Sequence, residues 1–142
     1  MAPPQVSASK PAAARKCVLI VEDNDLNMKL FTAMISAEGY EVLQAADGSG
    51  GLEMARQRRP DLIIMDIQLP GMSGLDVTQS LKGDEGTREI PIIATTAFAL
   101  RGDEATIRAS GCDAYMAKPI AISEFLELVE LFMSRARREP VA

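Results

Sequence analysis

Four short polar segments of the sequence each follow an apolar run, and their side chains could together hold a cation and an anion. Glu22 and Asp23 follow the run CVLIV, and Asp66 follows DLIIM. Thr96 closes PIIATT, and Lys118 follows AYMA. Carboxylates brought to one place repel one another, so such a cluster is costly unless a cation neutralises it. Carboxylate and carbonyl oxygens with room for water suit Mg²⁺ better than a soft metal.

The other two groups of this set are donors for an anion. An ammonium from Lys118 and a hydroxyl from Thr96, beside a divalent cation, are what a phosphoryl group needs as charge spreads over its oxygens. One of the carboxylates could also attack phosphorus and form an aspartyl phosphate. Taken singly, each residue has a plainer interpretation: solvated acidic turns, β-propensity of the threonines and a surface lysine. Only their convergence favours phosphoryl chemistry.

That convergence depends on a sheet, and the sequence alternates predicted strands with predicted helices. Strands are predicted over residues 17–21, 40–44, 61–65, 90–95 and 114–117, and helices over 26–38, 47–57, 74–82, 101–110 and 122–137. Continuous apolar strands joined by helical crossovers predict an α/β fold, (βα)₅, with a parallel sheet covered on both faces. In such sheets ligands bind at the carboxyl ends of the strands, which is where the polar segments fall.

Helix starts carry their own signals. Asp47 is the predicted N-cap of the second helix, and Ser73 opens a capping box for the third. For the first helix the N-cap could be Asp23, Asn24 or Asp25.

Composition narrows the class of protein. A length of 142 residues with 47% hydrophobic content suggests one globular domain. No apolar run approaches the roughly 20 residues that span a membrane, and the N-terminus lacks a signal-peptide core, so we expect a cytoplasmic protein. Histidine is absent and Cys17 and Cys112 lack metal-ligand spacing, which argues against zinc sites and Ser-His catalysis. Small buried thiols are favoured over a disulfide.

Charge is distributed unevenly along the chain. Of the net charge of −5, residues 1–16 contribute +3 and residues 135–139 contribute +2, so residues 17–134 carry −10. Such a domain does not suit nucleic acid, but it suits a divalent cation or a basic partner surface. We expect a flexible N-terminal tail over 1–15, the domain over 16–138 and a short C-terminal tail over 139–142.

The segments that carry the polar groups resemble the response-regulator receiver family over about 120 residues. The matching segments are VLIVEDN (18–24), LIIMDIQLPGMSGLD (62–76), PIIATTAFA (91–99) and GCDAYMAKPI (111–120). Within that family, EDNDLNMKLF, MDIQLPGMSGLDVT and TAFA are most similar to the DivK-type single-domain regulators of alphaproteobacterial cell division. The resemblance implies a flavodoxin-like sheet with strand order 2-1-3-4-5.

The resemblance also implies a role for each acidic residue. Asp66 is expected to be the phosphoacceptor. Glu22, Asp23 and Asp66, with the backbone carbonyl of Gln68, are expected to hold Mg²⁺. The first acidic pair of this sequence is Glu-Asp, a known variant of the Asp-Asp pair of the family. Glu22 could therefore reach the metal through water.

The remaining positions are expected to respond to the phosphoryl group. Thr96 binds one of its oxygens and Lys118 pairs with it. The bond between Lys118 and Pro119 is expected to be cis, a minority state for X-Pro bonds that rests on the resemblance. Tyr115 is expected to be the switch aromatic, changing rotamer with phosphorylation.

The expected partners are proteins. The resemblance implies a phosphohistidine donor on a sensor histidine kinase or phosphotransfer protein, and a downstream protein target, with recruitment to a cell pole by membrane kinases. Few residues follow 137, so output is expected through protein contacts. We expect no nucleic acid, no membrane insertion, and a monomer or weak dimer.

Two helices have more apolar surface than one buried side needs. In the first, Leu26, Leu30, Ala33 and Ala37 form one stripe, and Met28, Phe31 and Ile35 form a second. The extra stripe either docks a kinase helix or is buried in a two-sided helix. In the last helix the predicted core stripe is Ile122, Phe125, Leu126 and Val129, which leaves Leu128 and Leu131 for a partner.

Three other functions compete with this interpretation. A phosphatase with an aspartyl intermediate would want a carboxylate at Gln68, so we expect no turnover enzyme. A flavodoxin-type cofactor module would place a flavin phosphate against the acidic EDNDLN loop, which would repel it. A constitutive scaffold with a receiver fold, binding kinases without phosphorylation, is the main alternative to the phosphoacceptor.

Overall fold

The computed structural model describes residues 16–97 and 101–138 of the chain. The predicted tails, 1–15 and 139–142, lie outside the described residues. In the described part, five parallel strands form one sheet in the order β2-β1-β3-β4-β5, which confirms the predicted doubly wound α/β fold. The strands are β1 (Cys17–Val21), β2 (Glu41–Ala45), β3 (Leu62–Asp66), β4 (Ile92–Thr96) and β5 (Ala114–Ala117). The helices are α2 (Asp25–Ala37), α3 (Gly48–Arg58), α4 (Gly74–Lys82), α5 (Arg101–Ala109) and α6 (Ile122–Arg138).

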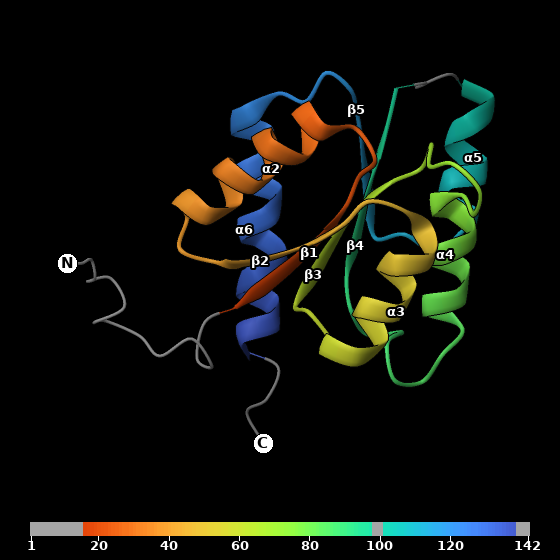
Figure 1. Ribbon diagram of the computed structural model, residues 1–142, viewed down its shortest axis with the longest axis horizontal. Coiled ribbons are helices and arrows are strands. Elements are labelled where there is room, and N and C mark those ends of the chain that lie inside the picture. The colour runs from red at the N-terminus through yellow and green to blue at the C-terminus, as the bar shows by residue number, and fades with distance from the viewer. Residues whose placement is uncertain (1–15, 98–100, 139–142) are drawn as a thin grey trace.

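Helices cover both faces of the sheet (Figure 1). On one face, α2 and α6 lie side by side, and the Phe31 and Phe125 rings meet at a centroid distance of 5.2 Å. On the other face, Ala55 of α3 and Val77 of α4 belong to one buried cluster with Leu19 of β1. Burial on both faces explains why the strands read as continuous apolar runs rather than as alternating ones.

The boundaries of β1 and β5 are those predicted, and the boundaries of β2, β3 and β4 differ from the prediction by one or two residues. β4 begins at Ile92 because Ile90 N–H bonds Thr87 O in a turn and Pro91 has no N–H to give to a ladder. β3 extends to Asp66, which pairs in register with Thr95 of β4. The phosphoacceptor candidate is therefore the last residue of the central strand.

The predicted helix caps are present. Asn24, one of the three candidates, caps α2 by accepting from Asn27 N–H at 2.9 Å. Asp47 and Ser73 cap α3 and α4 as predicted. A glycine at position 51 lets α3 lie close to β1, because a Cβ there would be 2.7 Å from a methyl carbon of Val21.

The structure decides between the two predictions for the extra apolar stripe of the first helix. Phe31 and Ile35 of α2 are buried, whereas Leu26 and Leu30 are 66% and 53% exposed. The prediction that this helix is buried on two sides is therefore wrong.

One prediction for the last helix is also wrong. Ile122 does not belong to the core stripe of α6 but is 59% exposed. It is the first residue of the helix, directly after the chain leaves β5, and the buried positions start one turn later at Phe125. Leu126 and Leu128 pack at the edge of the core, and Leu131 is exposed.

Charged groups at the amino ends of the strands form structural hydrogen bonds. Asp61, just before β3, accepts from Cys17 N–H at 2.8 Å. Asp113, just before β5, accepts from Ile92 N–H at 2.8 Å and from Lys82 Nζ at 2.9 Å. Lys82 also donates to the carbonyl oxygens of Arg88 and Ile90. These contacts fasten neighbouring strands and α4 to one another.

In the described ranges, no helix is long and apolar enough to cross a membrane.

Candidate functional site

The carboxyl ends of four strands bring the predicted site residues to one edge of the sheet. β1 leads into Glu22 and Asp23, β3 ends at Asp66, β4 ends at Thr96, and β5 leads into Lys118. Backbone hydrogen bonds hold these ends in place: Glu22 N–H donates to Ala45 O at 3.0 Å, and Lys118 N–H donates to Thr96 O at 2.7 Å. The expected convergence is therefore present.

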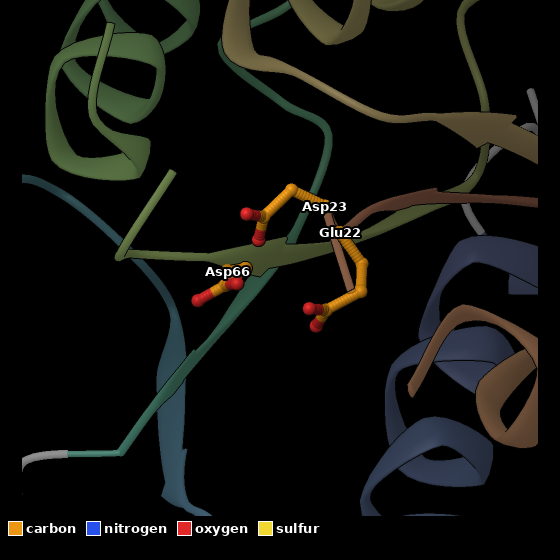
Figure 2. Close-up of side chains that lie close together, drawn as sticks. All are labelled: Glu22, Asp23 and Asp66. Carbon is orange, nitrogen blue, oxygen red and sulfur yellow. The ribbon is translucent and has the colours of Figure 1, made fainter. Parts of the chain in front are cut away.

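Three carboxylates form the centre of the site. The side chains of Glu22, Asp23 and Asp66 point toward one another (Figure 2), with one oxygen of each lying within 4.8 Å of the others. Glu22 and Asp66 are 2% and 3% exposed, whereas Asp23 is exposed. Two of the three carboxylates are thus withdrawn from water, and in this buried environment their mutual repulsion is poorly screened.

A single described ammonium offsets these charges. Lys118 Nζ lies 3.2 Å from Glu22 Oε1 and 3.4 Å from Asp66 Oδ2. Backbone amides add partial compensation: Gln68 N–H donates to Asp66 Oδ1 at 3.0 Å, and Asn24 N–H donates to Glu22 Oε2 at 3.2 Å. Among the described residues the cluster therefore retains an excess of negative charge.

This excess perturbs the protonation of Glu22. Burial raises the pKa of the Glu22 carboxyl above its ordinary value of 4.5, and the neighbouring Asp66 charge raises it further. The Asn24 amide and Lys118 act in the opposite direction but do not cancel the effect. Perturbed carboxyls gather at functional sites, so the raised pKa makes Glu22 a candidate functional residue.

The donor set fits a hard divalent cation. All three side-chain donors are carboxylate oxygens, and one of the three is exposed, which leaves room for water ligands. A cation of charge two among these oxygens would neutralise the destabilising charge excess. Soft-metal ligands have no part in the cluster, because neither free cysteine belongs to it.

The remaining predicted residues lie at or beside this edge. Thr96 is 2% exposed at the end of β4. The peptide bond between Lys118 and Pro119 is cis, as expected. Tyr115 lies within β5, where the Arg108 guanidinium stands over its ring at 5.2 Å from the centroid. A hydrogen bond to Glu104 raises the pKa of the Tyr115 hydroxyl. Tyr115 is thus held against α5 and is not part of the carboxylate cluster.

The structure adds one contributor that the sequence indicated only as a helix start. Gly74 opens α4 and donates its N–H to Ile67 O at 3.0 Å. A Cβ at this position would lie 2.7 Å from Ile67 Cα and 2.9 Å from the carbonyl carbon of Asp66. Only glycine lets α4 begin this close to Asp66. The available signal was a poor helix former at the first position of a predicted helix.

Known proteins share this combination of sheet and site. Residues 18–130 match the family model described as the response regulator receiver domain. The chain is 54% identical over 121 residues to the polar-differentiation response regulator DivK of Brucella anthropi, an alignment covering 85% of this chain and 98% of that protein. The DivK protein of Brucella ovis is equally similar.

Solved structures agree with the sequence comparisons. The receiver domain of a Pseudomonas aeruginosa sensor histidine kinase, solved with a magnesium ion coordinated in its active-site cleft, is 36% identical with a TM-score of 0.79. That match covers 85% of this chain and 99% of the solved chain. A CheY-like receiver protein from Methanospirillum hungatei is 26% identical with a TM-score of 0.81, over 89% and 99% of the two chains. The extent of the family match and the shared fold show that this chain belongs to the response regulator receiver family.

Proposed function

We propose that this protein is a response regulator in which Asp66 accepts a phosphoryl group from a phosphohistidine in a Mg²⁺-dependent step. The observation that supports this most directly is the cluster of Glu22, Asp23 and Asp66, with a carboxylate oxygen of each within 4.8 Å of the others. In the transfer, an oxygen of the Asp66 carboxylate attacks phosphorus and the phosphorus–nitrogen bond of the donor breaks. The imidazole nitrogen leaves with the electron pair, and an acyl phosphate remains on Asp66.

The residues around Asp66 have separate tasks in this proposal. Glu22, Asp23, Asp66 and the backbone carbonyl of Gln68 would hold Mg²⁺, which supplies positive charge opposite the incoming phosphoryl oxygens. Lys118 already lies between Glu22 and Asp66, so it can turn to an oxygen of the new anion. The Thr96 hydroxyl donates to another oxygen, and Tyr115 carries the change to the surface of α5 and β5.

We propose that the phosphodonor docks through an apolar helix with basic residues beside it. Exposed Leu26 is in the first turn of α2, which follows the Glu22–Asp23 pair. Exposed Ile122 begins α6, which follows Lys118, so apolar side chains flank the site. The neighbouring α6 surface carries the exposed acids Glu124 and Glu127. The partner would be a sensor histidine kinase or a phosphotransfer protein, which must bring its histidine to this edge of the sheet.

The cellular role is proposed from the relatives. The most similar named proteins reported above are polar-differentiation response regulators. This supports a cytoplasmic regulator of cell division that kinases recruit to a cell pole, with output through contacts to a downstream protein.

Intact mass measurement tests the proposed chemistry. Wild type, Asp66→Ala and the matched surface control Asp76→Ala are incubated with Mg²⁺ and acetyl phosphate. Wild type and Asp76→Ala should each gain one phosphoryl mass, and EDTA should abolish the gain. Asp66→Ala should gain none. Failure of the wild type to gain mass and also to bind beryllofluoride would favour the constitutive scaffold.

A further inference from the structure

The side chain of Gln68 connects two loops at the site edge. Its Oε1 accepts from Ala97 N–H at 2.9 Å, across 29 positions of sequence. Its own backbone N–H donates to Asp66 Oδ1 at 3.0 Å. Gln68 therefore touches the phosphoacceptor carboxylate through its backbone and the segment after β4 through its side chain.

Ala97 directly follows the end of β4, the strand next to the one that ends at Asp66. Asp66 and Thr95 are register partners, and Ile67 N–H bonds Thr95 O at 3.0 Å. Ala97 follows two residues after Thr95, directly beyond Thr96, so its amide borders the same strand ends. An amide has one hydrogen, which a neutral side-chain oxygen holds less strongly than a phosphoryl oxygen would.

Modification of Asp66 would also weaken the other end of the connection. The Asp66 carboxylate now accepts the Gln68 N–H as an anion. In an acyl phosphate that carboxyl group is part of a mixed anhydride and loses its own charge, so it becomes a weaker acceptor for the same N–H. Both hydrogen bonds of Gln68 thus belong to the unmodified protein.

We infer that Gln68 is a latch that holds Ala97 in the unmodified state and opposes the change that an anion on Asp66 induces. This inference rests on the proposed function, because it assigns a regulatory role at the same site. A contact made in only one of two states stabilises that state, so removing it shifts the equilibrium toward the other. Loss of one neutral hydrogen bond predicts a shift of roughly two- to tenfold.

The test compares Gln68→Leu with the matched exposed control Gln79→Leu. Beryllofluoride, added with Mg²⁺, stands in for the phosphoryl group. Gln68→Leu should bind it roughly two- to tenfold more tightly than wild type. Mg²⁺ is kept saturating for every variant, so that only the affinity for beryllofluoride is compared. Gln79→Leu should match wild type in this titration.

Nuclear magnetic resonance checks the contact itself without any anion. The Ala97 amide should exchange faster with solvent in Gln68→Leu and should keep its protection in Gln68→Glu, which retains an acceptor oxygen. An unchanged Ala97 amide in Gln68→Leu, or beryllofluoride affinity equal to or weaker than wild type, would overturn the latch. If wild type itself binds no beryllofluoride, the proposed function fails and the latch with it, and the amide measurement still reports whether the contact exists.

Discussion

The amino ends and the carboxyl ends of the strands differ in how fully the protein compensates their charged side chains. At the amino end, Asp61 and Asp113 accept backbone N–H groups of neighbouring strands, and Lys82 has three oxygen acceptors. At the carboxyl end, Glu22 and Asp66 are nearly fully buried and share Lys118. Within the described ranges, the one buried side-chain polar atom without a hydrogen-bond partner, Thr95 Oγ1, also lies toward this end.

The difference separates charges that stabilise the fold from charges held ready for a ligand. At the amino end the charged groups find their hydrogen-bond partners within the protein, so they need no ligand. The carboxyl end keeps a charge excess that the protein does not neutralise, and that excess is a reason for a cation to bind there. Fold stability should therefore depend on bound Mg²⁺ at one end only.

The largest effect is expected from Gly74→Ala, which tests how tightly the carboxyl end is packed beneath its charges. The new Cβ would force α4 away from the Asp66 and Ile67 backbone, at a cost of about 2–3 kcal/mol in the free energy of unfolding. Urea denaturation measures the loss, and phosphoryl uptake should fall with it. The control Gly86→Ala should be nearly neutral, since its Cβ meets only side-chain atoms at ordinary contact distance, of Arg59 at 3.5 Å and of Asp84 at 3.7 Å. Equal stability of the two variants would contradict the close approach.

A paired lysine experiment compares the two ends directly. Lys82→Met removes three donated hydrogen bonds and should cost about 2 kcal/mol whether or not Mg²⁺ is present. Lys118→Met leaves the buried carboxylates of Glu22 and Asp66 without their ammonium. It should destabilise the protein in EDTA, and Mg²⁺ should restore most of the loss. Urea unfolding of both variants with and without Mg²⁺ measures this, and an identical response to Mg²⁺ at the two ends would refute the contrast.

The smallest effect is expected in the pH dependence of the metal-free protein. Because the pKa of Glu22 is raised by burial and by Asp66, the folded state keeps the proton to higher pH than the unfolded state. The contribution of the Glu22 carboxyl to folding stability is fully present below pH 4.5. It is lost as the pH rises through the raised pKa of the folded state. In EDTA, Glu22→Gln should therefore melt at the same temperature as wild type at low pH and on the order of a few degrees higher near neutrality.

Thermal melts of both proteins across this pH range measure the difference. Saturating Mg²⁺ should reduce this difference in melting temperature or make wild type the more stable protein, because wild type keeps the Glu22 carboxylate as a metal ligand. A melting difference that stays constant with pH would mean that Glu22 is not perturbed by its surroundings.

Sequence alone was sufficient for the elements and for bringing the candidate site residues to one edge of the sheet. Apolar runs of five or so residues alternating with capped helices implied a parallel sheet, and a parallel sheet must collect its strand ends at one edge. Glu22, Asp66 and Lys118 could therefore be placed together without coordinates. Caps such as Asp47 and Ser73 were also readable, because a capping side chain bonds an amide only three residues away.

Three-dimensional packing decided what depends on distant neighbours. Which stripe of α2 is buried, the exposure of Ile122, the need for glycine at 74 and the contact from Gln68 to Ala97 all depend on residues far away in sequence. Periodicity reports that a helix has apolar sides but not which side meets the sheet. Local sequence thus specifies secondary structure and residue chemistry, while burial and charge compensation arise only when separate strands and helices share the same space.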